Sequence, residues 1–161
     1  MKNTKGFSLI ELLIVVAIIG IIAAIAVPNL LKSRQAANEA SAISCTRTIG
    51  TSQATYQSTA GANLNFCSTL LVLGSNGYVD PVLGSGTKSG FSFASIGTPA
   101  TAAGVPSYFD TQATPLQTGT FGTGNRSFYS NETYVIYFSS GGTAPTAAFP
   151  TRVPTGATAL Q

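Results

Sequence analysis

The sequence predicts an α+β fold, in which one long, protruding N-terminal α-helix packs on a small antiparallel β-sheet. Three observations predict it. An apolar run without charge, Leu12–Val27, lies near the start of the chain. Residues 29–59 contain no proline and a single glycine, and continue the helix. After residue 90, short stretches of alternating apolar and polar residues are separated by loops rich in Gly, Thr and Pro. The length of 161 residues suits one domain.

The first apolar segment, Phe7–Val27, is long enough to cross a membrane. As a helix with a rise of about 1.5 Å per residue, it would span about the 30 Å of a bilayer core. The apolar part of a secretory signal typically has only about 7–15 residues. Length therefore favours a membrane anchor. Because Ala24-Ile25-Ala26 resembles a signal cleavage site, a secreted binding domain that begins after Ala26 is the alternative.

Glu11 is the one charged residue in this segment. A carboxylate in a lipid-facing helix costs up to about 2.5–3.5 kcal/mol at the bilayer centre and less near the interface, so it suggests a functional partner. If the chain is cut after Gly6, Phe7 carries a cationic amine one helical turn from Glu11. The amine of one copy can then meet Glu11 of the next copy and set the register between packed helices. A tolerated interfacial acid is the alternative.

Residues 5–13, KGFSLIELL, resemble the leader and methylation motif of type IV pilins and type II secretion pseudopilins, and the similarity continues to residue 30. The resemblance implies the pilin fold and assembly into a helical filament. It also implies that a prepilin peptidase cuts between Gly6 and Phe7, and that Phe7 is then N-methylated. In the assembled filament, Glu11 would neutralise the terminal amine of a neighbouring subunit.

The same resemblance divides the chain into three parts. Residues 1–6 form a cleaved leader, residues 7–28 a transmembrane and later filament-core helix, and residues 29–161 a periplasmic or extracellular globular domain. Loss of Lys2 and Lys5 with the leader reduces the formal net charge of +3 to +1. Since no run of Lys or Arg remains, nucleic-acid binding is expected only as an activity of the whole filament.

We expect one continuous helix from Ser8 to Thr59, bent at Pro28. Proline lacks a backbone donor, so it frees the carbonyl of Ala24. Gly20 is a second weak point in the helix. In the family that the sequence resembles, the stretch between such a glycine and proline can unwind within the filament. The resemblance thus implies a helix-melting region between Gly20 and Pro28.

Beyond Pro28, small and apolar residues recur at a spacing of three or four and predict the face that packs on the sheet. These residues are Ala42, Cys45, Ile49, Ser52 and Tyr56. The charged residues of this half of the helix are expected to remain in water or to contact neighbouring copies. They are Lys32, Arg34, Glu39 and Arg47.

Cys45 and Cys67 are the two cysteines of the chain. In a protein exported to an oxidising compartment, an even pair predicts a disulfide, which here would pin the segment after the helix back onto it. Two buried free thiols are the alternative. Redox catalysis is not expected, because the chain has no C-x-x-C motif.

Three or four strands are expected after a turn that ends at Asp80-Pro81. The candidates are residues 90–96, 107–113, 126–130 and 133–139, the last two joined at Asn131-Glu132. Residues 98–106 and 114–124 read as loops, and residues 141–161 as a low-complexity surface tail. Aromatic residues are expected to fill the core between helix and sheet. They are Tyr56, Phe91, Phe93, Tyr134, Tyr137 and Phe138.

The composition argues against an enzyme. The chain has no histidine, and its distal carboxylates are scattered singly. We therefore expect no catalytic residue, no cofactor and no metal. Asp80, Asp110 and Glu132 are expected to be solvated rather than gathered into a calcium site.

The predicted function is that of a pilin, the structural subunit of a type IV pilus-like surface filament. The subunit would be held in the inner membrane as a precursor. It would then polymerise with identical copies, served by the prepilin peptidase and the pilus assembly machinery. Adhesion, motility and DNA uptake are the activities that such a filament supports. The alternative within the family is a pseudopilin of a type II secretion system.

Overall fold

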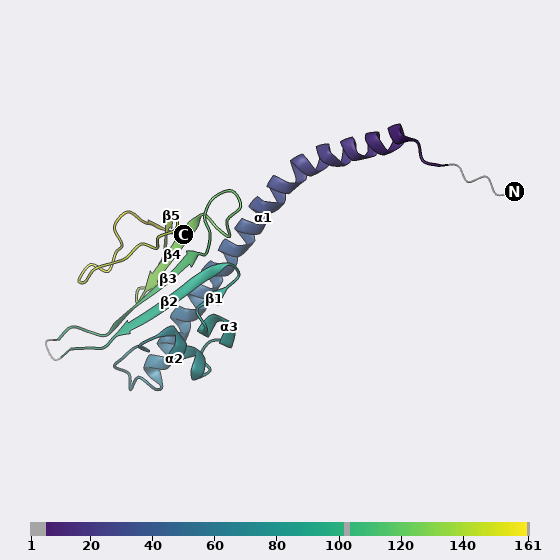
Figure 1. The fold of residues 1–161 in the computed structure, drawn as a ribbon. Coiled ribbons are helices and arrows are strands. Elements are labelled where there is room, and N and C mark those ends of the chain that lie inside the picture. Colours follow the sequence, from purple (N-terminus) through teal and green to yellow (C-terminus); the bar gives the residue numbers. More distant parts are fainter. Residues whose placement is uncertain (1–5, 102–103, 161) are drawn as a thin grey trace.

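The computed structural model describes residues 6–101 and 104–160. A long helix, α1, extends away from a compact head, and its first residues lie far from that head (Figure 1). The long protruding helix and the small antiparallel sheet confirm the predicted α+β fold class.

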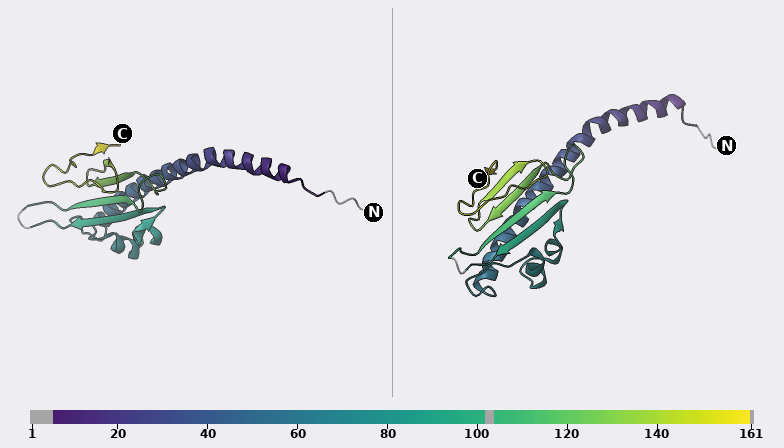
Figure 2. Two further views of the ribbon diagram at one scale, coloured as in Figure 1. Left: turned by 45° about the horizontal axis from the view of Figure 1, so that its top comes forward. Right: turned by 60° about the vertical axis from the view of Figure 1, so that its left-hand side comes forward.

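Helix α1 runs from Leu9 to Ser58 and has 50 residues. At about 1.5 Å per residue it is about 75 Å long. Ser8 and Thr59 cap its two ends, so the boundaries predicted from the sequence are confirmed. Pro28 lies inside the helix, which curves along its length without a break (Figures 1 and 2).

The sheet is a six-stranded antiparallel meander in which the strands lie in sequence order. Its strands are β1 (Thr87–Lys88), β2 (Phe91–Thr98), β3 (Tyr108–Pro115), β4 (Arg126–Asn131), β5 (Ile136–Ser140) and β6 (Thr158–Ala159). Strands β2 to β5 confirm the four predicted strands. The two short strands at the edges were not predicted, because two residues carry no alternating pattern.

The hairpin between β4 and β5 is longer than predicted. Asn131 ends β4, and β5 begins only at Ile136. Between them, the backbone N–H of Tyr134 donates to the carbonyl of Asn131 at 2.9 Å, and Tyr134 has a φ of 59°. Tyr134 is 51% exposed, so its prediction as a core residue is wrong. The side-chain oxygen of Asn131 also accepts from the backbone N–H and the hydroxyl of Thr133, at 3.1 and 2.7 Å, so local hydrogen bonds hold this turn.

Helix α1 packs on one face of the sheet (Figure 2). Ala42, Cys45 and Ile49 are buried on the predicted helix face, Ser52 is buried beside them, and Tyr56 packs partly buried at its end. Phe91 and Phe93 of β2 meet this face, as predicted. The sequence reading missed further buried aromatic residues of the strands. They are Phe109, Phe128 and Tyr129.

Strand β4 is covered on both faces. Side chains alternate between the faces of a strand. Phe128 belongs to the core beneath α1, so Tyr129 and Asn131 point to the other face. Both are fully buried nevertheless, because the C-terminal segment lies over them, and the Asn131 amide donates to the carbonyl of Arg152 at 2.7 Å. The tail predicted to lie on the surface is therefore a second cover of the sheet.

Two short helices, α2 (Leu70–Ser75) and α3 (Pro81–Gly84), lie on either side of the predicted turn before the sheet, and neither helix was predicted. The Thr69 hydroxyl accepts from the Val72 N–H at 3.4 Å, and the Asp80 carboxylate accepts from the Leu83 N–H at 3.0 Å. These caps satisfy donors that a short helix leaves open.

The predicted disulfide is not present in this structure, where Cys45 and Cys67 are free and buried. The Cys67 thiol donates to the Thr69 carbonyl at 3.4 Å, and both side chains belong to the apolar core beneath α1. Burial raises the pKa of both thiols above the ordinary value. The structure thus agrees with the alternative of two buried thiols, which pack as small apolar groups.

Candidate functional site

The N-terminal half of α1 presents a long apolar surface. Every residue from Leu9 to Leu30 is exposed, and this part of the helix is long and apolar enough to cross a membrane. Contiguous apolar patches of more than a few hundred Å² are uncommon on monomers and mark interaction or membrane surfaces. The segment therefore needs lipid or other protein around it.

Glu11 lies in the first turn of this apolar helix. Its carboxylate accepts a hydrogen bond from the backbone N–H of Ser8 at 2.9 Å. That contact is the acidic half of a capping box, in which the third helical residue reaches back to the capping residue, and the helix dipole favours an acid there. The sequence signal for this capping box is Ser-x-x-Glu at residues 8–11. Glu11 thus has a partner in its own chain.

The predicted cleavage position is accessible. Gly6 and Phe7 precede the helix, and Phe7 is 86% exposed. The remaining residues of the predicted leader lie outside the described residues. Cleavage and N-methylation at this position stay predictions.

The predicted melting region is helical in this structure. Gly20 and Pro28 both lie inside α1. A Cβ added at Gly20 would meet no atom within 4 Å, so packing does not require a glycine there. Unwinding between these residues stays a prediction about the filament.

Three polar residues of α1 clamp the loop between β3 and β4. Gln35 donates to the carbonyls of Gly119 at 2.7 Å and Gly122 at 3.0 Å, and Asn38 donates to that of Thr123 at 2.9 Å. Their spacing, completed by Glu39, places them on one side of the helix. The loop is thereby fixed against α1 just beyond the apolar segment.

Glu39 completes the clamp, and its prediction as a wet residue is wrong. It is 8% exposed. One carboxylate oxygen accepts from the backbone N–H groups of Asn125 at 2.8 Å and Arg126 at 3.1 Å. The other accepts from Nε of Arg126 at 2.7 Å. A carboxylate with several donors and one cation is stable at such a depth.

The prediction of three solvated carboxylates is confirmed for Asp80, which is exposed, and wrong for Asp110 and Glu132, which are partly buried. Asp80 caps α3 and pairs with Lys88 at 3.0 Å. Asp110 and Glu132 both pair with the guanidinium of Arg152. The nitrogen–oxygen distances are 2.8 Å to Asp110 and 2.7 Å to Glu132. Within residues 6–101 and 104–160, no group of three His, Cys, Asp or Glu side chains is arranged to hold a metal ion.

Arg152 is a buried cation that the sequence analysis did not single out. It is 6% exposed, and its guanidinium also donates to the carbonyls of Phe109 and Ala147. It lies over the ring of Tyr108, with 4.4 Å from Cζ to the ring centroid. The pKa of Arg152 is raised, mainly because its guanidinium donates a hydrogen bond to Glu132. The available signal was a lone arginine in an otherwise uncharged tail.

The hydroxyl of Tyr129 extends this cluster, since it donates to the carboxylate of Asp110. Burial, and next this hydrogen bond, raise the pKa of Tyr129 well above its ordinary value. Tyrosine therefore stays neutral here and serves as a donor. The cluster ties the C-terminal segment to the sheet.

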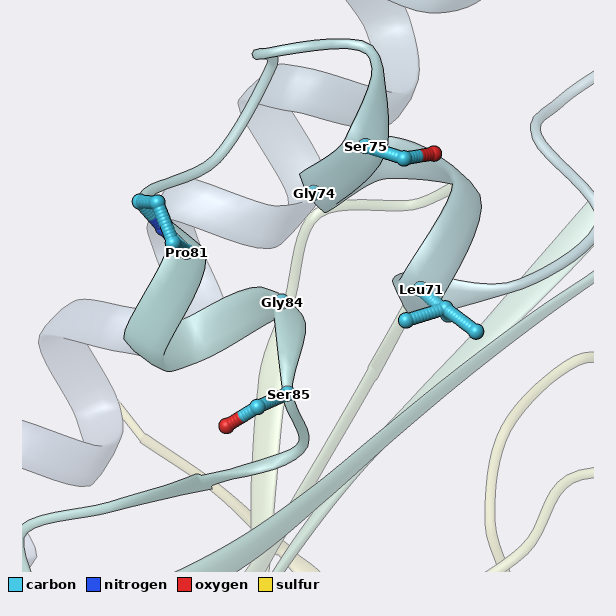
Figure 3. A pocket seen from close by; sticks show the side chains of 6 residues that line it. All are labelled: Leu71, Gly74, Ser75, Pro81, Gly84 and Ser85. Carbon is cyan, nitrogen blue, oxygen red and sulfur yellow. The ribbon is translucent and has the colours of Figure 1, made fainter.

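A shallow pocket of about 240 Å³ lies between α2 and α3 (Figure 3). All the residues that line it are uncharged. They are Leu71, Gly74, Ser75, Pro81, Gly84 and Ser85. The two helices approach so closely that a Cβ on Gly74 would lie 2.8 Å from Cα of Gly84. The pocket follows from this close packing of α2 against α3.

Comparison with known proteins identifies the N-terminal segment. Residues 1–27 match the model of the prokaryotic N-terminal methylation motif. The chain is 64% identical over 39 residues to the type IV wide pilus major component PilA4 of Thermus thermophilus. The matched stretch covers 24% of this chain and 30% of that protein. This segment is that of the type IV pilin family.

Two further relatives agree with this assignment. The type IV major pilin protein PilA of Myxococcus xanthus is 44% identical over 54 residues, or 34% of this chain and 24% of that protein. A fimbrial protein of Pseudomonas aeruginosa is 76% identical over 29 residues, or 18% of this chain and 19% of that protein.

The matches cover less than a third of these relatives' length and no more than 34% of this chain. No solved structure matches the chain. The comparisons therefore identify the pilin-type helix, whereas the head is described by its own geometry.

Proposed function

We propose that this chain is the structural subunit of a type IV pilus-like surface filament. The subunit is held in the inner membrane by residues 7–28, loses residues 1–6 to a prepilin peptidase, and is N-methylated on Phe7. The pilus assembly machinery then transfers it into a helical filament of identical copies. This agrees with the pilus components among the relatives, which share the N-terminal segment.

The observation that carries the proposal is the exposed apolar half of α1, attached to a head with its own core. Burying apolar surface away from water lowers the free energy of the protein by about 25 cal/mol per Å². Lipid supplies this burial before assembly, and the helices of neighbouring copies supply it afterwards. A chain with this surface is stable only in one of these two environments.

Glu11 supplies register in the proposed filament. Once the leader is removed, Phe7 carries a free amine directly before the capping residue Ser8. In the single subunit the Glu11 carboxylate is held by the Ser8 N–H, so it is already oriented toward the N-terminal end of the helix. An amine from a neighbouring copy can approach the same carboxylate. Such buried pairs add little net affinity, but they penalise misaligned copies.

The test compares the wild-type chain with Glu11→Ala and Glu11→Gln in cells that export it. We expect mass spectrometry of wild-type filaments to show a chain that begins with methylated Phe7. Both variants should be cleaved and remain in the membrane, yet yield at least tenfold fewer filaments, since an unpaired buried charge costs about 3 kcal/mol.

Ile10→Leu is the matched control, because it alters the neighbouring apolar residue without changing charge. Normal filaments of Glu11→Ala that still carry the leader would refute the proposed role. An exported protein that begins after Ala26 would instead indicate a secreted domain behind an ordinary signal.

A further inference from the structure

Phe121 is an exposed aromatic residue held beside the apolar helix. It is 78% exposed and lies at the tip of the clamped loop between β3 and β4. Together with Thr120 it faces the helix across a groove of about 400 Å³. The helix side of this groove is formed by Gly20, Ala23, Ala24, Val27, Pro28 and Leu31.

The position of this groove along α1 is fixed. Hydrogen bonds from Gln35 to Gly119 and Gly122 hold the loop on both sides of Phe121, and Gly122 N–H closes the turn onto the Gly119 carbonyl at 3.0 Å. The tip therefore cannot swing away from the helix without breaking the clamp.

The groove falls at the expected edge of the bilayer. A hydrocarbon core of about 30 Å holds about 20 helical residues. Counted from Leu9, the core ends near Pro28, and the groove extends from Gly20 to Leu31. Phe121 is then at the level where one leaflet meets water.

The charges around the groove complement an anionic surface. Lys32 and Arg34 follow the apolar run directly, and both are exposed. The nearest acid along the helix, Glu39, is buried against Arg126. The accessible charge next to the groove on α1 is therefore positive. Basic residues near a membrane attract anionic lipid headgroups, and apolar side chains at that depth enter the acyl boundary.

We propose that the loop of Phe121 is a second membrane anchor, which docks the head on the outer leaflet before assembly. Phe121 enters the headgroup and acyl boundary, lipid fills the groove beside Gly20 to Pro28, and Lys32 and Arg34 contact the phosphates of anionic phospholipids. The inference rests on the proposed membrane-held stage. The loop fixes how deeply and at what angle the head sits on the membrane.

The test uses the full chain in lipid vesicles and the absence of tryptophan from its sequence. Phe121→Trp introduces a single fluorescent reporter at the loop. Phe149→Trp is the control, because Phe149 is another exposed aromatic residue of the head and is stacked on Tyr108 at the start of β3. Val16→Trp reports insertion of the helix itself.

In vesicles of phosphatidylethanolamine and phosphatidylglycerol, Trp emission of the Phe121→Trp chain should shift to the blue. Lipids brominated near the headgroup end of the acyl chain should quench it, whereas the Phe149→Trp chain should stay unquenched. Neutral phosphatidylcholine vesicles, or Lys32→Gln with Arg34→Gln, should roughly halve the quenching, because the attraction to anionic headgroups is lost.

Quenching of Val16→Trp without quenching of Phe121→Trp would overturn this inference and leave the membrane anchor intact. If neither Val16→Trp nor Phe121→Trp is quenched, the membrane-held stage is overturned as well. A blue shift of Phe121→Trp only in purified filaments, with none in vesicles, would assign the groove to a second copy of the chain and would also overturn the inference.

Discussion

Arg152 connects the low-complexity tail to the sheet through one side chain. Its guanidinium contacts Asp110 and Glu132, which lie on or next to two different strands. A planar group with five donors can satisfy two carboxylates and two carbonyls at once, which lysine cannot do. The tail contains no other charged residue after Glu132. Its attachment therefore depends on this position.

Arg152→Met should destabilise the head by about 3 kcal/mol, because two part-buried carboxylates lose their cation. Residues 141–160 should become sensitive to limited proteolysis in the detergent-solubilised chain. Lys88→Met is the control: it breaks the exposed pair with Asp80 and should change stability by less than about 0.5 kcal/mol. Equal effects of the two variants would contradict the assigned role of Arg152.

The two thiols should report the integrity of the head. Their raised pKa values favour the neutral form in the folded chain. This stabilisation is complete below the pKa of an unfolded thiol and is lost as the pH rises through the higher folded values. We expect iodoacetamide to label neither cysteine of the native chain at pH 8, and both after unfolding without reductant. Absence of labelling after unfolding would show a disulfide in the exported protein.

At the scale of elements, α1 is one helix with two environments. Its first half is apolar and exposed all around, so it has no preferred face. Its second half buries a stripe that includes Ala42 and Ile49 against the sheet and uses Gln35, Asn38 and Glu39 to hold a loop. Such a long helix is supported by tertiary contacts only in its second half.

Gly20→Ala should stiffen the first half. Alanine favours an α-helix over glycine by about 1 kcal/mol, and a Cβ at this position meets no atom within 4 Å. If the Gly20 to Pro28 stretch unwinds in the filament, the variant should form filaments that extend less under force in an optical trap.

Ala17→Gly is the control, because it exchanges the same two residue types outside that stretch. It should not reduce the extension of the filament under force. Filament density that shows a continuous α-helix from Gly20 to Pro28 in the wild type would remove the melting hypothesis.

At the scale of the whole molecule, the proposed assembly and the folding of the head use separate surfaces. The head has its own core between α1 and the sheet, whereas Leu9 to Leu30 remain exposed. Ile19→Asp should therefore abolish filaments, since a carboxylate at the centre of an apolar helix costs about 2.5–3.5 kcal/mol, and should leave the head folded.

Filament counts by electron microscopy and thiol protection in detergent would measure these two effects separately. Ile19→Leu is the matched control and should assemble normally. Loss of thiol protection in Ile19→Asp would show that the two surfaces are coupled.

Local signals predicted most of the fold. The helix from Ser8 to Thr59 was found because the apolar run and the proline-free stretch that continues it are contiguous in the sequence. Strands β2 to β5 were found because their residues alternate. The roles of Glu39 and Arg152 were missed, because each depends on a partner that lies far away in sequence, at Arg126 and at Asp110 and Glu132.

The sequence by itself determined the apolar helix, its acidic residue Glu11 and the order of the main strands, since each follows from neighbours within a few residues. Only the tertiary structure decided that Glu39 and Arg152 are buried and ion-paired rather than solvated. It also decided that the tail covers β4 and that Phe121 lies beside the apolar helix. The physical reason is that burial and ion pairing depend on which distant segments meet.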